Sequence, residues 1–79
     1  MKHLYPIFVD LHGKNCLVIG GGEVAERKIE DLLVYGAAIT VVSPQITAKL
    51  KALVDNAAIA CLYREFQDSD IENVFMVFA

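Results

Sequence analysis

A cluster of three glycines is the part of this sequence best suited to chemistry. The stretch Gly20-Gly21-Gly22-Glu23-Val24-Ala25 matches the pattern G-x-G-x-x-A. It follows a short apolar run and precedes an amphipathic stretch, which is the strand, turn and helix context that the pattern requires. The first glycine permits a tight turn, and N–H groups around Gly22, Glu23 and Val24 can hold phosphate oxygens with help from the helix dipole. The pattern favours dinucleotide binding over a turn that merely connects strand to helix.

The acidic residue that usually binds the ribose in such sites is absent. It normally lies about 20 residues after the glycines, at the end of the second strand. Here that place falls on Val42-Ser43-Pro44. Ser43, or backbone groups of Pro44 and Gln45, could bond a ribose hydroxyl; the alternative is that Ser43-Pro44 is simply the turn at the start of the next helix. Since no arginine stands beside this point to bind a 2′-phosphate, the sequence favours NAD over NADP.

Short apolar runs bounded by turn residues predict strands that hold this site in place. They are rich in β-branched and aromatic residues and do not alternate with polar ones, as in parallel strands covered on both faces. The runs are 16–19, 39–42, 59–62 and 74–78. One apolar stripe predicts a helix that ends near Gly36, and a second predicts a helix from Pro44 to about Asn56. A single helical turn is expected over Asp70–Asn73.

This alternation predicts an α/β fold with a Rossmann-like parallel sheet, helices on both faces and an extended N-terminal segment. The order β-α-β-α-β-β is the first half of such a fold. We therefore expect residues 1–79 to form a single NAD(P)-binding domain that is incomplete at its C-terminus. An incomplete sheet exposes its last strand, so association through that edge is also expected.

Composition excludes several classes of function. The 79 residues are 56% hydrophobic with a mean hydropathy of +0.46, which excludes intrinsic disorder. A net charge of −3 argues against nucleic acid as a partner. No apolar run approaches the ~18 residues of a membrane span. The N-terminus has no cleavable signal, so we expect a cytoplasmic protein without a membrane partner.

Other residues that could do chemistry show weaker patterns. The potential metal ligands lack spacings such as C-x-x-C, so no metal site is expected; they are His3, His12, Cys16 and Cys61. The cysteines are predicted to be reduced residues of the core. Arg64 follows the third strand, where ligands of such sheets gather, and is a candidate for adenosine or carboxylate contact. The alternative is a local pair with Glu65 or Asp68.

Several stretches together resemble the N-terminal domain of siroheme synthases. The same domain occurs in stand-alone precorrin-2 dehydrogenases, some of which are also sirohydrochlorin ferrochelatases. The resemblance rests on Leu4-Tyr5-Pro6-Ile7-Phe8-Val9-Asp10-Leu11, on Cys16 to Lys28 with the string G-G-G-E-V-A-E-R-K, on Gly36 to Pro44 and on Val74 to Ala79. It covers essentially the whole chain.

The resemblance implies NAD-dependent oxidation of precorrin-2, a tetrapyrrole, to sirohydrochlorin. The residues expected to bind the cofactor are Gly20, Gly21, Gly22, Glu23, Val24, Ser43, Pro44 and Gln45. Members of the family carry their catalytic aspartate in an A-T-D-D-like motif directly after the strand that here ends at Ala79, and their dimerisation region lies further downstream. These 79 residues are thus expected to contain no catalytic residue, to be inactive alone and to form a homodimer only with that region. Arg27 and Lys28 are more typical of a solvated helix face than of contacts to substrate carboxylates.

Two other functions stay open. One is a non-catalytic dinucleotide-sensing module, and the other is a different NAD(P)-dependent reductase that shares only the fold. Sensors typically carry the ribose-binding acid, so its absence and the Pro6-Ile7-Phe8 segment favour the dehydrogenase. Residues after Ala79 would distinguish the two enzyme hypotheses. An A-T-D-D-like motif favours the dehydrogenase, and a catalytic Lys, Tyr or Cys favours another reductase.

Overall fold

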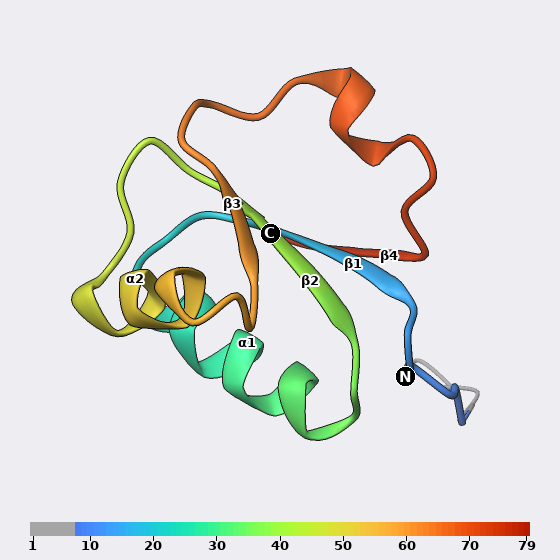
Figure 1. The fold of residues 1–79 in the computed structure, drawn as a ribbon. Coiled ribbons are helices and arrows are strands. Elements are labelled where there is room, and N and C mark those ends of the chain that lie inside the picture. The colour runs from blue at the N-terminus through green and yellow to red at the C-terminus, as the bar shows by residue number, and fades with distance from the viewer. Residues whose placement is uncertain (1–7) are drawn as a thin grey trace, which may run out of the picture.

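The computed structural model describes residues 8–79, which form an α/β fold around one parallel sheet (Figure 1). The four strands lie in the order β3-β2-β1-β4. In chain order the elements are β1 (Asn15–Ile19), α1 (Glu23–Val34), β2 (Ala38–Val42), α2 (Ala48–Asp55), β3 (Ala60–Leu62), the 3-10 helix η1 (Asp68–Ile71) and β4 (Met76–Phe78). The predicted fold class is confirmed.

The register of the sheet places the two predicted halves of the site at the same edge. Ile19, the last residue of β1, is paired with Val42, the last residue of β2. The N–H of Gly20 then donates to the carbonyl oxygen of Val42 at 3.0 Å. Since the strands are parallel, the turns that follow β1 and β2 leave the sheet side by side.

The crossovers cover the two faces of the sheet differently. Figure 1 shows α1 and α2 on one side of the sheet and η1 on the other. From β1 to β2 to β3 the chain advances in one direction, so successive right-handed crossovers place both α-helices on the same face. Strand β4 lies on the other side of β1, and its connection from β3 crosses the opposite face. The predicted helices on both faces are thus, in the described residues, two α-helices on one face and a short 3-10 helix on the other.

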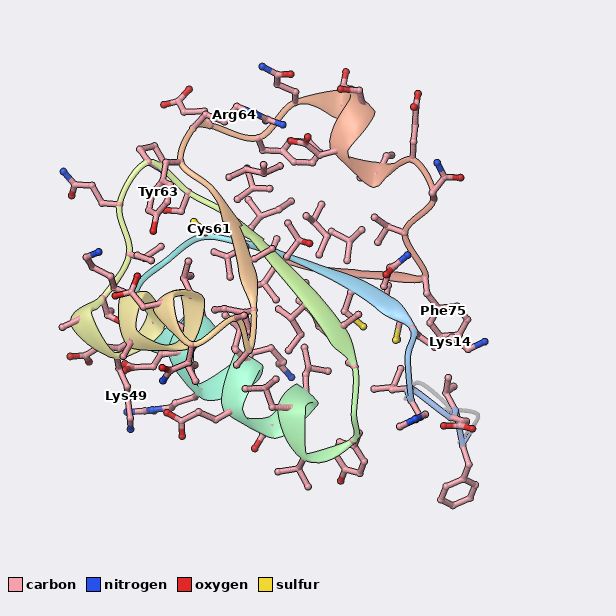
Figure 2. The ribbon with its side chains drawn as sticks, viewed as in Figure 1. Lys14, Lys49, Cys61, Tyr63, Arg64 and Phe75 are labelled. Carbon is pink, nitrogen blue, oxygen red and sulfur yellow. The ribbon has the colours of Figure 1, made fainter. Side chains whose placement is uncertain are left out.

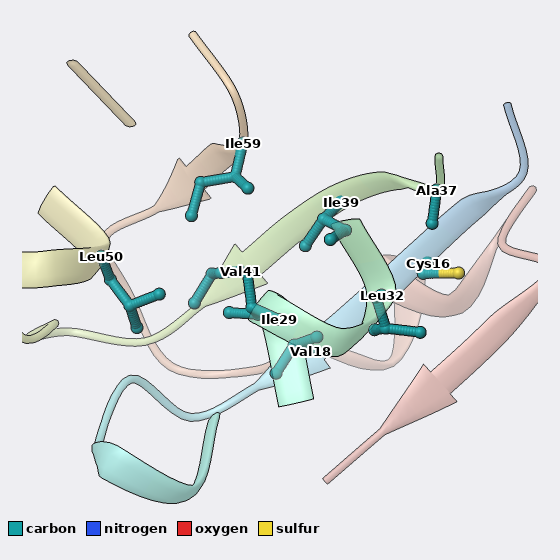
Figure 3. Packing of buried hydrophobic residues seen from close by; sticks show 9 residues of the cluster. All are labelled: Cys16, Val18, Ile29, Leu32, Ala37, Ile39, Val41, Leu50 and Ile59. Atoms are coloured by element: carbon teal, nitrogen blue, oxygen red, sulfur yellow. The ribbon is translucent and has the colours of Figure 1, made fainter. Parts of the chain in front are cut away.

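The core lies between the sheet and the two α-helices (Figure 3). Alternate residues of β1 and β2 pack against both helices and against Ile59, which directly precedes β3. The buried cluster is Cys16, Val18, Ile29, Leu32, Ala37, Ile39, Val41, Leu50 and Ile59. Leu17 and Val42 point to the opposite face and are only 2% and 1% exposed. Both strands are therefore buried on both faces, which explains why their sequences do not alternate.

Helix α2 begins later than the sequence predicts. It starts at Ala48 rather than near Pro44. Thr47 is the N-cap, and its Oγ1 accepts a hydrogen bond from the N–H of Leu50 at 3.2 Å. A threonine that satisfies one of the free donors of the first turn is a stronger start signal than a proline three residues earlier. The predicted end near Asn56, the C-cap, is confirmed.

The end and the beginning of the chain also differ from the prediction. The helical turn expected over residues 70–73 is the 3-10 helix Asp68–Ile71, because the Asp70 carboxylate accepts from the N–H of Gln67 at 2.8 Å. Strand β4 starts at Met76, later than expected. Most of the predicted N-terminal segment, including Pro6, lies outside the described residues. Among residues 8–79, no helix is long and apolar enough to cross a membrane.

Candidate dinucleotide-binding site

The glycine turn joins β1 to α1 as the sequence predicts. Gly20 has a φ of 113°, a conformation that side chains other than glycine rarely adopt. Gly22 is the N-cap of α1, and its carbonyl oxygen accepts the N–H of Glu26 at 3.0 Å. Apart from its two chain neighbours, no described residue has an atom within 4 Å of where a Cβ on Gly22 would lie, so the space beside it is open. Ala25 packs against the core, as expected for the residue that keeps helix and sheet close.

The start of α1 presents backbone donors to this open space. Within residues 8–79, the N–H groups of Gly22, Glu23 and Val24 have no hydrogen-bond acceptor. The helix is 12 residues long, so its dipole adds partial positive charge at this end. The Glu23 side chain is an acidic group in the first turn and stabilises the helix itself. The arrangement is suited to bind an anion through backbone groups.

Gly21 has a different role from its neighbours. Its carbonyl oxygen accepts a hydrogen bond from the N–H of Thr47 at 3.0 Å. A Cβ on Gly21 would overlap the carbonyl oxygen of Gln45 and would lie 2.7 Å from Cγ2 of Ile46. Gly21 therefore lets the turn between β2 and α2 pack against the glycine turn. The sequence pattern leaves this position unspecified and gives no signal for that contact.

Two hollows flank Gly22 and contain all of the residues expected to bind the cofactor. We call the first the β2 hollow; it has a volume of about 510 Å³ and is lined by Gly21, Gly22 and residues 43–47. The second, the β4 hollow, has a volume of about 470 Å³ and lies between the start of α1 and the end of β4. Gly20, Gly22, Glu23 and Val24 line it together with Lys28 and Val77–Ala79. The fold thus brings residues 20–24 and 43–45 together around one glycine.

Ser43 is engaged within the turn that it begins. Its side chain is buried, and Oγ donates a hydrogen bond to the carbonyl oxygen of Gln45 at 2.6 Å. The hydroxyl proton is thereby used, while the oxygen keeps lone pairs that can accept a hydrogen bond. Residues 43–47 form the turn that leads into α2, which starts at Ala48, so a turn before the helix and a contact with ribose both remain compatible with Ser43-Pro44.

Arg64 binds a carboxylate of its own loop. Its guanidinium donates to both oxygens of Asp70, at 2.6 and 2.8 Å, and to the carbonyl oxygen of Glu65 at 3.0 Å. Figure 2 shows Arg64 on the loop that leads from β3 toward η1. The partner is Asp70, not the side chain of Glu65 or Asp68. The hydrogen bonds from Arg64, and then from the N–H of Gln67, lower the pKa of Asp70 to about 2.

The two cysteines are free thiols within the fold. Cys16 is buried and Cys61 is half-buried. Burial raises the pKa of both thiols, so both are protonated at neutral pH. In the part of the chain that the structure describes, no three His, Cys, Asp or Glu side chains are grouped so that they could hold a metal ion.

The parallel sheet and the glycine turn before α1 define an α/β domain of the Rossmann type. The chain belongs to the protein family described as "Putative NAD(P)-binding", whose model matches residues 7–79. Among solved structures, it is similar to "SirC, precorrin-2 dehydrogenase", with a TM-score of 0.87 and 35% sequence identity. That match covers 94% of this chain and 37% of the other.

Curated relatives carry siroheme-related names. A "probable multifunctional siroheme biosynthesis protein HemA" from Ruminiclostridium josui is 43% identical over 77 residues, 95% of this chain and 15% of the relative. The siroheme synthase of Neisseria meningitidis serogroup C is 45% identical over 75 residues, which cover 95% of this chain and 16% of the relative. The siroheme synthase of Pseudomonas fluorescens is 40% identical over 79 residues, which cover 100% of this chain and 17% of the relative. The resemblance seen in the sequence is confirmed, and the chain spans about one sixth of these relatives.

Proposed function

We propose that this chain is the dinucleotide-binding part of an NAD-dependent dehydrogenase that oxidises precorrin-2 to sirohydrochlorin. The proposal rests on one observation: the predicted residues of the glycine turn and of the β2–α2 turn line two hollows on either side of Gly22. The names of the similar proteins, siroheme synthase and precorrin-2 dehydrogenase, support this substrate and reaction.

In the proposed binding mode the pyrophosphate binds at the start of α1. The N–H groups of Gly22, Glu23 and Val24 hold its oxygens, and the open space beside Gly22 admits them. The β2 hollow takes the adenosine ribose, where Ser43 Oγ and backbone groups of Pro44 and Gln45 are available. The β4 hollow, with Val24 and Val77–Ala79 in its walls, takes the nicotinamide half. NAD supplies the acceptor for a hydride from the substrate.

The charge of the β2 hollow favours NAD over NADP. Its lining residues, Gly21, Gly22 and 43–47, carry no charged side chain. A 2′-phosphate usually pairs with an arginine at this place. Arg64, which follows the adjacent strand, is already bound to Asp70 through two hydrogen bonds. A 2′-phosphate would therefore lose hydration without gaining a cationic partner.

The chain's own contribution is cofactor binding rather than the complete reaction. Among the described residues that line the β4 hollow, Glu23 has the only acidic side chain, and it belongs to the first turn of α1. We assign no catalytic acid or base to these 79 residues. They are expected to bind NAD without oxidising precorrin-2, and turnover by this chain alone would contradict that assignment.

A two-dimensional amide NMR titration tests the proposed binding mode. On addition of NAD, the amide signals of residues 20–24 and 43–45 are expected to shift together, with smaller shifts for NADP at equal concentration. The amide of Arg64 serves as an internal control, because its side chain is bound within its own loop. Shifts confined to other regions, or stronger effects of NADP, would contradict the proposal.

A further inference from the structure

Lys28 lies at the wall of the β4 hollow and has no carboxylate partner among residues 8–79. Its Nζ lies 5.1 Å from the centre of the Phe78 ring. Within residues 8–79, Lys49, Lys51 and Arg64 form ion pairs, and Lys28 forms none. Glu23 lines the same hollow but is not within ion-pair distance of it. The neighbouring cation on the helix, Arg27, lines none of the hollows described for this chain.

The surroundings of Lys28 combine an apolar wall with one positive charge. Val24, Val77 and Phe78 lie in the wall of the hollow beside it. Lys28 and Phe78 also line a second hollow further along α1, so the pair stands between two open spaces. Asp31 lines that second hollow and forms no ion pair with Lys28. The face of the Phe78 ring attracts the ammonium and holds it at this wall, where its charge is available to an incoming anion.

We infer that Lys28 binds a carboxylate of the tetrapyrrole substrate at the wall of the β4 hollow. A tetrapyrrole such as precorrin-2 has an extended apolar ring system with several carboxylates at its edge. The ring of Phe78 matches the first feature and the Nζ of Lys28 matches the second. The inference rests on the proposed function, because it assumes that the nicotinamide half lies in the same hollow. Lys28 is a residue for substrate binding and orientation, with no part in proton or hydride transfer.

Uroporphyrin III, a stable tetrapyrrole with carboxylates around its edge, is a suitable probe. Its binding to the 79-residue chain is followed by fluorescence at low and high ionic strength, and NAD is titrated into the same samples. The variants are Lys28→Gln, Lys28→Arg as the charge-conserving form, and Arg27→Gln as a matched loss of one charge on the same helix. Lys28 is exposed, so thermal unfolding of all three is expected to match the wild type.

Lys28→Gln is expected to weaken porphyrin binding about tenfold, the effect of one charge-assisted contact, and to reduce its salt dependence. Lys28→Arg and Arg27→Gln should bind the porphyrin like the wild type. Unchanged porphyrin affinity of Lys28→Gln would overturn this inference but not the proposed function. The same holds if the wild type binds NAD but not the porphyrin. An equal loss of NAD and porphyrin affinity would overturn it too, since Lys28 would then bind the cofactor. A wild type that binds porphyrin through Lys28 but not NAD would contradict only the proposed function.

Discussion

The carbonyl oxygen of Gly21 accepts a hydrogen bond from the N–H of Thr47 at 3.0 Å, and this bond joins the glycine turn to the turn between β2 and α2. The two segments approach so closely that a Cβ on Gly21 would overlap the carbonyl oxygen of Gln45. The shape of the β2 hollow, which both segments line, thus depends on the absence of a side chain at residue 21.

Gly21→Ala is expected to destabilise the protein and to distort the β2 hollow. The added methyl meets backbone, which cannot rotate away, so the free energy of unfolding should fall by about 1–3 kcal/mol, as for other overpacked sites. Urea unfolding measures this change. Gly22→Ala is the matched control, since its methyl would enter open space and φ is −89°. Equal stability of Gly21→Ala and the wild type would contradict the close contact.

Thr47→Ala is expected to weaken the start of α2. The substitution removes the Oγ1 acceptor of the Leu50 N–H and should lower the free energy of unfolding by about 1 kcal/mol, the usual effect of a lost N-cap. Thr47→Ser keeps the hydroxyl and should retain most of the stability. If the two variants unfold at the same urea concentration, the cap contributes nothing.

The sequence predicts the elements of this fold well because their signals are local. Short apolar runs predict the four strands. Gly20 and Gly36 have a positive φ, which glycine adopts readily, and they predict the turns on either side of α1. The start of α2 differs from the prediction because Thr47, and not Pro44, precedes the first turn as its cap; a threonine cap is also a local signal.

The parts of the site that the sequence did not reveal depend on contacts between distant segments. The packing of Gly21 against Gln45 and Ile46 exists only once β1 and β2 are paired. Arg64 pairs with Asp70 because η1 directs the Asp70 carboxylate back toward the loop, where it also accepts from the N–H of Gln67. Neither contact has a residue pattern that periodicity or motif spacing can detect.

The ion pair of Arg64 and Asp70 predicts a particular acid sensitivity. Because the pKa of Asp70 is lowered from 3.8 to about 2, its contribution to stability is complete above pH 3.8 and is lost as the pH falls toward 2. Asp70→Asn should lower the free energy of unfolding at neutral pH. Near pH 2 the free energies of unfolding of the variant and the wild type should become similar. Asp68→Asn, on the same short helix, is the control. A constant difference between wild type and Asp70→Asn across this range would show that the pair does not stabilise the fold.

The position of β4 predicts association through the edge of the sheet. In the described residues β4 pairs only with β1, and Val77 is 44% exposed. Light scattering is expected to give a mass above 8.7 kDa that rises with concentration. Val77→Lys, which adds a charge to the edge strand, should reduce this association. A wild type that stays at the monomer mass over a wide concentration range would contradict the prediction.

Calorimetric titration of the 79-residue chain with NAD tests the central claim most directly. We predict saturable binding of one NAD per chain, weaker binding of NADP, and about tenfold weaker NAD binding by Gly22→Ala, whose methyl fills the space beside the N–H groups of α1. The free energy of unfolding of that variant should fall by less than about 1 kcal/mol. A folded wild type that does not bind NAD would contradict the account. So would a Gly22→Ala variant that binds NAD as tightly as the wild type.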